Sequence, residues 1–345
     1  MYRIAVDLGY GYIKGINQEG KKICFPSLVG PARSLKMRGF LNNGEDLQYQ
    51  LFLKHSTLDK EYFVGHLAEE ESPTASYAFD ENKINHPHTR VLLAAAAALL
   101  SEGGNSEPLH LATGLPLQHF FNQRNEFLTF LNDFEAEVSV GGGTHKRIVF
   151  DKVTLFPQGA GAIMEAGLQE RDLLQQGSYL GLVDFGFRTT DYVVYEAGDK
   201  FKPKSSLSGT IEIGMADLYK AVEAAFADLA GVKLDVLDID TVIRNGSIFY
   251  AGKDYDLKEV IAGAKADIAG AVLDRLKEAW GQKTNFLRVL FLAGGGAVEL
   301  KERFKGFHGD VRLLRDPQFG NARGFLRVIT PRGVENNVVS LHKNL

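Results

Sequence analysis

Short, predominantly apolar runs alternate with longer amphipathic stretches along this chain. Residues 2–6, 109–112, 180–183 and 288–292 form such runs, and each leads towards a turn rich in glycine. Apolar residues at helical spacing predict helices over 87–101, 118–132, 160–176, 215–229 and 257–280. The alternation predicts an α/β protein. Because several strands are followed directly by a hairpin partner, we expect mixed sheets rather than wholly parallel ones.

Two of the predicted strands end in the same way. The first runs into Asp7-Leu8-Gly9-Tyr10-Gly11-Tyr12-Ile13-Lys14, and the second into Asp184-Phe185-Gly186-Phe187-Arg188-Thr189-Thr190-Asp191. Glycine permits a tight turn into a second strand and lets backbone N–H groups converge on an anion. An aspartate at the strand end repels phosphate, but it can hold a hydrated Mg²⁺ that phosphates share. Two such hairpins predict two similar domains that bind one nucleotide phosphate chain, although either hairpin alone is also typical of an ordinary turn.

Composition and charge exclude several classes of protein. The 345 residues suggest two or three domains, and the net charge of −4 with dispersed Lys and Arg argues against direct nucleic-acid binding. Cys24 is the only cysteine, which excludes a disulfide framework and a cysteine zinc site. The longest apolar run, 91–100, is too short to span a bilayer, and no signal peptide is evident. We therefore expect a cytoplasmic protein without a membrane anchor.

A glycine run follows the strand at 288–292. Gly294, Gly295 and Gly296 would let adenine and ribose lie flat on the backbone, and the alternative is a plain strand-to-helix turn. This run lies near the carboxyl end and lacks the GxGxxG spacing, which argues against a dinucleotide site. Another glycine run, 141–143, is interpreted as a hairpin turn because no helix or GK[ST] sequence follows it.

Five stretches, 7–15, 156–162, 183–191, 292–297 and 317–324, stand in an order that resembles the actin / Hsp70 / sugar-kinase ATPase superfamily over essentially the whole chain. They look like its first phosphate loop, first connecting helix, second phosphate loop, adenosine motif and second connecting helix. Three details look most like the prokaryotic actin-like ATPases of the plasmid-segregation ParM/StbA type and their archaeal relatives. These are Phe156-Pro157-Gln158-Gly159, Arg188-Thr189-Thr190-Asp191 and Gln318-Phe319-Gly320-Asn321-Ala322-Arg323-Gly324.

The resemblance implies an actin-like ATPase fold, in which two similar domains with mixed sheets flanked by helices enclose a nucleotide cleft. Domain I would comprise residues 1–157 plus 318–345, and domain II residues 158–317. Two positions bear on the comparison with actin itself. Phe187 stands where actin has an aspartate, whereas Gln158 agrees with actin.

Phosphoryl transfer to water needs charge neutralisation and an in-line nucleophile, and the candidate residues divide between these tasks. Asp7 and Asp184 would hold Mg²⁺ through water, and Gln158 would position the attacking water without taking its proton. Lys14 would reach the phosphates as a point charge, the alternative being a solvated strand lysine. The helix amino end at 159–162 would add favourable polarity towards anions. Phosphate oxygens would be bound by the backbone N–H groups of Leu8, Gly9, Tyr10, Gly11 and Tyr12, and of Gly186, Phe187, Arg188 and Thr189.

The leading hypothesis is an ATPase that binds and hydrolyses ATP with Mg²⁺ and assembles with copies of itself into nucleotide-dependent filaments. Segregation of plasmid or other DNA, or cell organisation, would be its role, with a DNA-bound adaptor protein as a candidate partner. One alternative is a small-molecule kinase or activator ATPase on the same fold. It would need an acceptor pocket and an aspartate base such as Asp191, which sits further along its strand and could equally face solvent. A third hypothesis is a non-polymerising regulatory ATPase.

Overall fold

The chain divides into two compact units, and each is described by itself. The computed structural model describes residues 1–33, 49–55, 58–77, 86–101, 108–169, 176–197 and 202–331. Unit 1 comprises Met1–Glu165 and Phe319–Leu345, and unit 2 comprises Ala166–Gln318. The border lies inside helix α4 (Ala160–Gln169), a few residues beyond the expected position before Gln158. The expected loops at 31–50 and 69–86 lie partly outside the described residues, and the tail at 334–345 lies wholly outside them.

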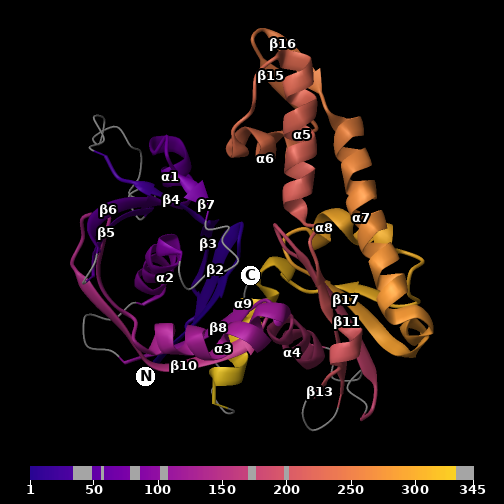
Figure 1. Cartoon of the computed structure of the whole chain (residues 1–345), viewed down its shortest axis with the longest axis horizontal. Helices are drawn as coiled ribbons and strands as arrows, with labels where there is room; N and C mark the ends of the chain where they lie inside the picture. The colour runs from indigo at the N-terminus through magenta and orange to yellow at the C-terminus, as the bar shows by residue number, and fades with distance from the viewer. Residues whose placement is uncertain are drawn as a thin grey trace, which may run out of the picture. The chain divides into compact units, whose positions relative to one another are not determined.

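Unit 1 is built on a mixed sheet that curls around helix α2 (Pro87–Leu100) (Figure 1). Strands β1, β8 and β10 run parallel at its centre, and β2 pairs antiparallel with β1. The order across the described sheet is β3-β2-β1-β8-β10-β9-β5-β6-β4-β7. The strands are β1 (Tyr2–Leu8), β2 (Tyr12–Asn17), β3 (Lys22–Pro26), β4 (Leu28–Pro31), β5 (Gln50–His55), β6 (Leu58–Val64), β7 (Ser76–Tyr77), β8 (Leu109–Leu115), β9 (Glu135–Val140) and β10 (Lys146–Pro157).

Strand β10 corrects one expectation. The sequence predicts separate strands over 147–150 and 153–159, but β10 is continuous from Lys146 to Pro157. Its first part pairs antiparallel with β9 and its second part pairs parallel with β8. The register shifts between Phe150 and Lys152, where an extra residue bends the strand and lets it change partner.

Helix α2 of unit 1 is packed by small residues, whereas α3 (Leu117–Asn132) buries larger apolar side chains. In α2, Pro87 occupies the first turn, and the five alanines from 94 to 98 are buried inside the curled sheet. From the sequence, the apolar residues at helical spacing in 118–132 are expected to face the core. Helix α3 does bury Phe127 and Leu131, but Phe121 is 66% exposed, so this expectation is wrong at that position. The other described helices of this unit are α1 (Gly65–Glu71), which the sequence analysis missed, α4 and α9 (Gly320–Ile329).

Helices α4 and α9 cross with their backbones in contact. A Cβ placed on Gly324 would lie 1.8 Å from the carbonyl oxygen of Gly161, so neither position has room for a side chain. Beside the crossing, the Phe325 ring stacks on Phe156 with centroids 5.2 Å apart. The buried Glu165 carboxylate accepts from Arg323 at 2.9 Å and from Arg327 at 3.0 Å. These contacts join the start of α4 to α9, which is the last described helix.

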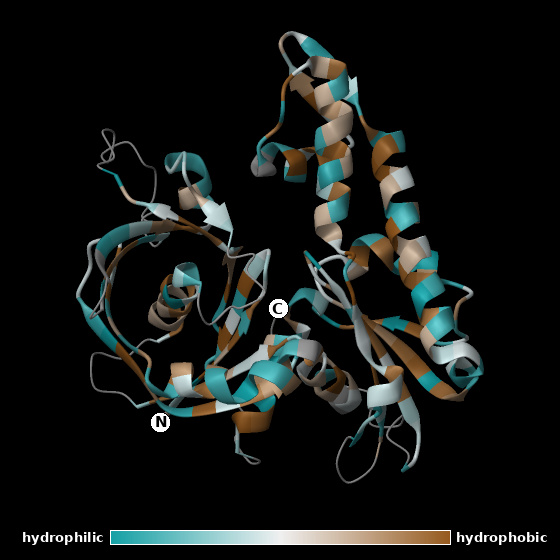
Figure 2. Cartoon of the chain, viewed as in Figure 1, coloured by the Kyte–Doolittle hydropathy of each residue, from teal (hydrophilic) through white to brown (hydrophobic). Residues whose placement is uncertain are grey.

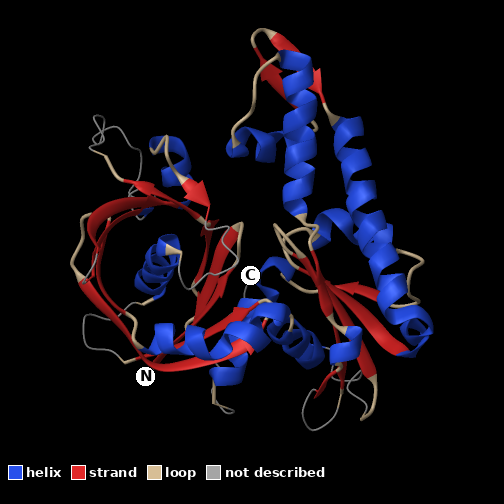
Figure 3. Cartoon of the chain, viewed as in Figure 1, coloured by secondary structure: helices blue, strands red, loops and turns tan. Residues whose placement is uncertain are grey.

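Unit 2 combines a smaller mixed sheet with long helices (Figure 3). Its described order is β13-β12-β11-β17-β18, with β14 on β12. The strands are β11 (Tyr179–Phe185), β12 (Thr190–Glu196), β13 (Lys202–Pro203), β14 (Gly209–Ile211), β17 (Leu287–Ala293) and β18 (Val311–Leu313). The helices are α5 (Met215–Ala230), α6 (Val236–Asn245), α7 (Lys258–Trp280) and α8 (Ala297–Leu300). A separate hairpin, β15 (Ser247–Tyr250) with β16 (Lys253–Asp256), precedes α7, and neither it nor α6 was predicted. No helix in the described part of the chain is long and apolar enough to cross a membrane.

Candidate functional site

The two glycine hairpins have the same register. In unit 1, Asp7 on β1 stands opposite Lys14 on β2. In unit 2, Asp184 on β11 stands opposite Asp191 on β12. In each hairpin the last pair of opposite residues lies one position further along. The four residues between the members of that pair, Gly9–Tyr12 and Gly186–Thr189, form the turn. The repeated sequence motif is therefore a repeated local structure, with its aspartate at the carboxyl end of a buried strand.

The first glycine of each turn is required by a close backbone approach. A Cβ on Gly9 would lie 2.5 Å from the carbonyl oxygen of Tyr12, and one on Gly186 would lie 2.7 Å from that of Thr189. In the second turn the Gly186 N–H also donates to the Thr189 carbonyl at 2.9 Å. A side chain at either glycine would force the turn open, so both turns depend on glycine for their curvature.

Each turn is held by a neighbouring element through its carbonyl groups. Ser27 braces the first turn: its Oγ donates to the Gly9 carbonyl at 2.7 Å and its N–H donates to the Gly11 carbonyl at 2.8 Å. The start of α5 braces the second, where the N–H groups of Met215 and Ala216 donate to the carbonyls of Gly186 and Phe187. From the sequence, Ser27 is expected only as the last residue of a strand over 22–27. Its bracing role depends on a contact that spacing does not reveal.

Asp7 and Gln158 lie together, as their predicted roles require. Strands β1, β8 and β10 are parallel, so their carboxyl ends meet at one edge of the sheet. Gln158 follows β10 directly, and its N–H donates to the Leu115 carbonyl at 2.7 Å. Its Nε2 donates to Oδ1 of the buried Asp7 at 2.9 Å. The amide proposed to orient water is thus fixed by the carboxylate proposed to hold the metal.

The amino end of α4 differs from the expectation. The sequence suggested that the N–H groups at 159–162 would add polarity towards an anion. In the structure, Oδ1 of the buried Asn321 accepts from the Gly159 N–H at 2.9 Å and from the Ala162 N–H at 3.4 Å. Asn321 therefore caps this helix, and two of the amides counted on for anions are engaged within the protein.

Asp184 and the glycine run also lie together, within unit 2. Asp184 stands beside Ala293 in the parallel pair of β11 and β17. A Cβ on Gly294, whose φ is +85°, would lie 2.4 Å from Oδ1 of Asp184. The Gly296 N–H donates to the Phe185 carbonyl at 3.2 Å. Gly295 is exposed, and a Cβ there would meet nothing within 4 Å. The outer two glycines are therefore required by close packing within the turn, whereas a side chain at the middle one would project into open space.

Asp191 does not face solvent, which corrects one alternative from the sequence. It is buried, and its Oδ1 accepts from Oγ1 of Thr210 at 2.5 Å. Directly opposite residues of an antiparallel pair project on the same face, so Asp191 shares the face of Asp184. Lys14 occupies the equivalent position in unit 1. The two hairpins therefore match in backbone and differ in charge: one pairs an acid with a base, the other two acids.

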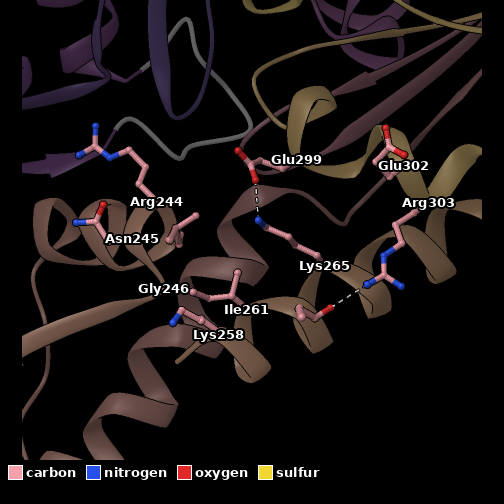
Figure 4. Close-up of a pocket in the computed structure, with 11 residues that line it drawn as sticks. Arg244, Asn245, Gly246, Lys258, Ile261, Lys265, Glu299, Glu302 and Arg303 are labelled. Atoms are coloured by element: carbon pink, nitrogen blue, oxygen red, sulfur yellow. Dashed lines mark hydrogen bonds and ion pairs between the residues drawn. The ribbon is translucent and has the colours of Figure 1, made fainter. Parts of the chain in front are cut away.

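A pocket of about 370 Å³ lies in unit 2 next to the element that follows the glycine run (Figure 4). Ile243 and Ile261 contribute apolar surface, and Lys265 forms an ion pair with Glu299 at 2.6 Å. Arg303 donates to the Ala262 carbonyl at 3.5 Å. Further polar and charged lining comes from Arg244, Asn245, Lys258 and Glu302. Sequence reasoning missed this pocket because one wall is the unpredicted α6.

Comparison with known proteins follows the same division of the chain. Residues 5–161 match the model of the actin-like protein N-terminal domain, and residues 182–306 match that of the archaeal actin homologue MreB-like C-terminal domain. A 15-stranded ParM filament from Clostridium botulinum contains a chain that is 34% identical over 95% of this chain and 98% of that one, with a TM-score of 0.86. This chain belongs to the actin-like protein family. The predicted family and fold class are thereby confirmed.

More distant relatives share the fold of this actin-like protein. An archaeal actin homolog from Thermoplasma acidophilum is 23% identical over 94% of this chain and 98% of its own length. A crystal structure of an archaeal actin homolog in complex with ADP has a TM-score of 0.80 and covers 95% of this chain and 99% of that one, at 21% identity. The predicted arrangement of α/β elements is therefore common to bacterial and archaeal members of the family.

Proposed function

We propose that this actin-like protein binds and hydrolyses ATP with Mg²⁺ and assembles with copies of itself into nucleotide-dependent filaments. The observation that carries the proposal is the equal register of the two glycine hairpins, each with an aspartate at the end of its first strand. A tight turn alone explains the repeated glycine, but it explains neither the repeated aspartate nor the repeated brace on the carbonyl groups. A fixed turn that offers its N–H groups to phosphate, beside a carboxylate that holds Mg²⁺, accounts for all three.

Backbone and charge have separate tasks in this proposal. Each turn supplies N–H groups to phosphate oxygens, and Lys14 supplies a positive charge. Asp7 and Asp184 fit Mg²⁺, which prefers hard oxygen donors and binds through one or two carboxylates with several waters retained. The ion, when bound, neutralises charge on the phosphates. The protein's own contribution is to hold each carboxylate at a strand end beside a fixed turn.

The pocket beside α8 fits the base and ribose. Its apolar side chains offer a surface for a flat ring, while Lys265 and Glu299 offer a donor and an acceptor for polar edges and hydroxyl groups. The exposed Gly295 leaves space for a close approach to the backbone. This assignment extends the predicted adenosine site from Gly294, Gly295 and Gly296 to α6 and α7.

Gln158 orients the attacking water in this proposal. Its Nε2 is held by Asp7, which fixes the direction of the side-chain carbonyl, an acceptor for a water O–H. An amide cannot take the proton, so hydrolysis should be slow compared with that of an enzyme using a carboxylate base. Slow hydrolysis suits a polymer whose lifetime is set by the nucleotide.

Two relatives support separate parts of the proposal. The similar ParM chain from Clostridium botulinum forms a filament, which supports assembly, and the archaeal actin homolog was crystallised with ADP, which supports nucleotide binding. We infer that this chain acts in the cytoplasm, in segregation of plasmid or other DNA or in cell organisation. A DNA-bound adaptor protein would provide the link to DNA, since the chain's own charge does not favour direct binding.

The test combines phosphate release with sedimentation. Purified protein is mixed with ATP and Mg²⁺, with ATP and EDTA, or with no nucleotide. We expect pelleted polymer and phosphate release only with ATP and Mg²⁺. Turnover without polymer under any nucleotide or salt condition would favour the kinase or regulatory hypothesis. Polymer without any nucleotide would contradict the proposed control by ATP.

A further inference from the structure

Phe187 is a position at which this chain departs from actin, and the structure gives its side chain a definite contact. Its ring meets that of Tyr219 on α5 edge-on, with centroids 5.2 Å apart and ring planes at 79°. An aspartate at position 187 could not form this aromatic pair. The turn Gly186–Thr189 is therefore tied to α5 by a side chain as well as by the amides of Met215 and Ala216.

The same tyrosine contacts α6 through its hydroxyl group. The Tyr219 O–H donates to Oδ1 of Asp240, which lies in the middle of α6. Both side chains are only partly exposed, and a hydrogen bond to a carboxylate is stronger than one between neutral groups. Phe187, Tyr219 and Asp240 thus form a continuous series of contacts from the turn to α6, which we call the Tyr219 bridge.

The end of α6 forms one wall of the pocket that we propose for the base and ribose. This wall consists of four successive residues, Ile243, Arg244, Asn245 and Gly246. Figure 4 shows the last three of them together at one side of the pocket. Residues three and four positions apart share one side of a helix, so Asp240 lies on the side of Ile243 and Arg244, one turn before them. Tyr219 therefore holds α6 one turn away from residues that line the pocket.

Helix α5 also contacts the glycine run. Hydrophobic and hydrophilic positions are interspersed along it (Figure 2), and Met215 and Tyr219, four residues apart, lie on one side. A Cβ on Gly296 would lie 2.4 Å from Sδ of Met215, so the Met215 side chain packs against this glycine. The first two turns of α5 consequently touch the turn Gly186–Thr189, the glycine run and α6.

We propose that the Tyr219 bridge holds α6 in the position in which the pocket accepts the base, and that Phe187 keeps Tyr219 in the orientation this requires. The inference rests on the proposed function, since it concerns the site assigned there to ATP. Without the bridge, α6 is correctly placed in only a fraction of molecules, and the apparent affinity falls by that fraction. Tyr219 is thus a positioning residue, which acts through Asp240 rather than on the nucleotide itself.

The first test separates the base from the phosphates. Tyr219→Phe removes the hydroxyl and keeps the ring, and Tyr250→Phe on β15, where the side chain is exposed, is the matched control. Isothermal titration in the presence of Mg²⁺ measures the Kd of ATP, adenosine and pyrophosphate. In Tyr219→Phe we expect the Kd of ATP and of adenosine to rise at least fivefold, and that of pyrophosphate to stay within twofold. The control should match wild type for all three ligands.

The pattern of affinities distinguishes positioning from plain stabilisation. A lower melting temperature in Tyr219→Phe with wild-type affinity for ATP and adenosine would overturn this inference and leave the proposed function standing. An equal loss of affinity for pyrophosphate would also overturn it, because the hydroxyl would then act on the whole unit. If wild-type protein binds neither ATP nor pyrophosphate, the proposed function is wrong, and this inference falls with it.

The second test follows the bridge residue by residue, with adenosine as the ligand and each titration made well below the melting temperature of the variant. Asp240→Asn keeps an oxygen acceptor and should stay within twofold of wild type, whereas Asp240→Ala should weaken adenosine at least fivefold. Adding Tyr219→Phe to Asp240→Ala should cause no further loss, because both changes remove the same hydrogen bond.

Phe187→Ala is the most demanding variant, since residue 187 lies in the turn proposed for phosphate and adenosine carries no phosphate. We expect its affinity for adenosine to fall at least threefold, because Tyr219 loses the ring that orients it. Wild-type affinity of Phe187→Ala for adenosine, or additive losses in the double variant of Tyr219 and Asp240, would overturn the bridge.

Discussion

The side chain of Gln158 donates a hydrogen bond to the carboxylate of Asp7 at 2.9 Å across 151 residues of sequence. The parallel strands β1, β8 and β10 bring the two residues to one edge of the sheet. Asp7 is 6% exposed, so this bond forms where water competes little. Any change at Gln158 is consequently felt by the carboxylate, and the two residues should be treated as one functional pair.

Asp184→Ala should abolish Mg²⁺-dependent hydrolysis and leave the fold intact. The carboxylate lies at the end of β11 beside the turn Gly186–Thr189, which we propose binds phosphate, and it is only partly buried. Phosphate release and thermal melting are measured on the same preparation. Asp274→Ala, which removes a surface carboxylate paired with Lys277 on α7, is the matched control and should keep wild-type turnover. A well-folded Asp184→Ala protein with full turnover would refute the metal assignment.

The two hairpins could be predicted from the sequence because the residues that form each one lie close together in the chain. Seven positions separate Asp7 from Lys14 and Asp184 from Asp191, and a four-residue turn closes each pair in the same register. Asp7 and Gln158 each follow or end a strand of a parallel set, and the carboxyl ends of parallel strands meet at one edge of the sheet. Their proximity could therefore also be foreseen. Ser27 and Asn321 were not, because each acts on backbone groups that belong to another element, and a hydroxyl or an amide has many such partners available.

The β15–β16 hairpin was not predicted, for a different reason. A two-residue hairpin turn of type I′ needs positive φ at both central residues, and Asn-Gly is its usual signal. Here Ala251 and Gly252 take φ of +48° and +82°. Alanine rarely adopts that conformation, so the sequence carried no turn signal. Helix α6 had an aspartate cap at Asp235 and a terminal glycine at Gly246, signals that are readable but are shared with loops.

Gly295→Val should block nucleotide binding without destabilising the protein. Its Cβ would meet no protein atom within 4 Å and its φ is not in the left-handed region, so the turn can accept the side chain. The added methyl groups would then occupy space that base and ribose need. Titration with a fluorescent nucleotide measures affinity, and we expect a loss of at least tenfold, or about 1.4 kcal/mol.

Gly294→Val provides the contrast. Its φ of +85° and the 2.3 Å approach to the Phe185 carbonyl predict a loss of stability as well as of binding. Unchanged affinity in Gly295→Val would show that the glycine run is only a turn and would remove the adenosine assignment.

Gly324→Ala should destabilise the protein, whereas Gly270→Ala should stabilise it, although both glycines lie in helices. At Gly324 the added carbon would lie 1.8 Å from backbone of α4, and at Gly270 in α7 it would meet nothing within 4 Å. Overpacking at the first site costs about 1–3 kcal/mol or more. Helix propensity at the second gains up to about 1 kcal/mol. Thermal melting should move in opposite directions, and a shared direction would contradict the close crossing of α4 and α9.

Gln158→Ala should separate assembly from hydrolysis. Alanine removes the hydrogen bond to Asp7 and the proposed water-positioning carbonyl but no charge, so ATP and Mg²⁺ should still bind. Hydrolysis should slow about 10- to 1000-fold, a loss of roughly 1.4–4 kcal/mol of transition-state stabilisation. Gln18→Ala is the matched control, since Gln18 accepts from Arg3 at the other end of β2 and should affect neither process.

The time course of Gln158→Ala decides how the nucleotide controls the polymer. If binding drives assembly and cleavage triggers disassembly, the variant should form filaments with ATP at the wild-type rate, and these should outlast wild-type filaments in proportion to the slower phosphate release. Sedimentation and phosphate release are followed in parallel samples. Filaments that disassemble at the wild-type rate while hydrolysis is suppressed would refute the coupling. Normal hydrolysis would refute the role of Gln158, because its bond to Asp7 would then serve only to position that carboxylate.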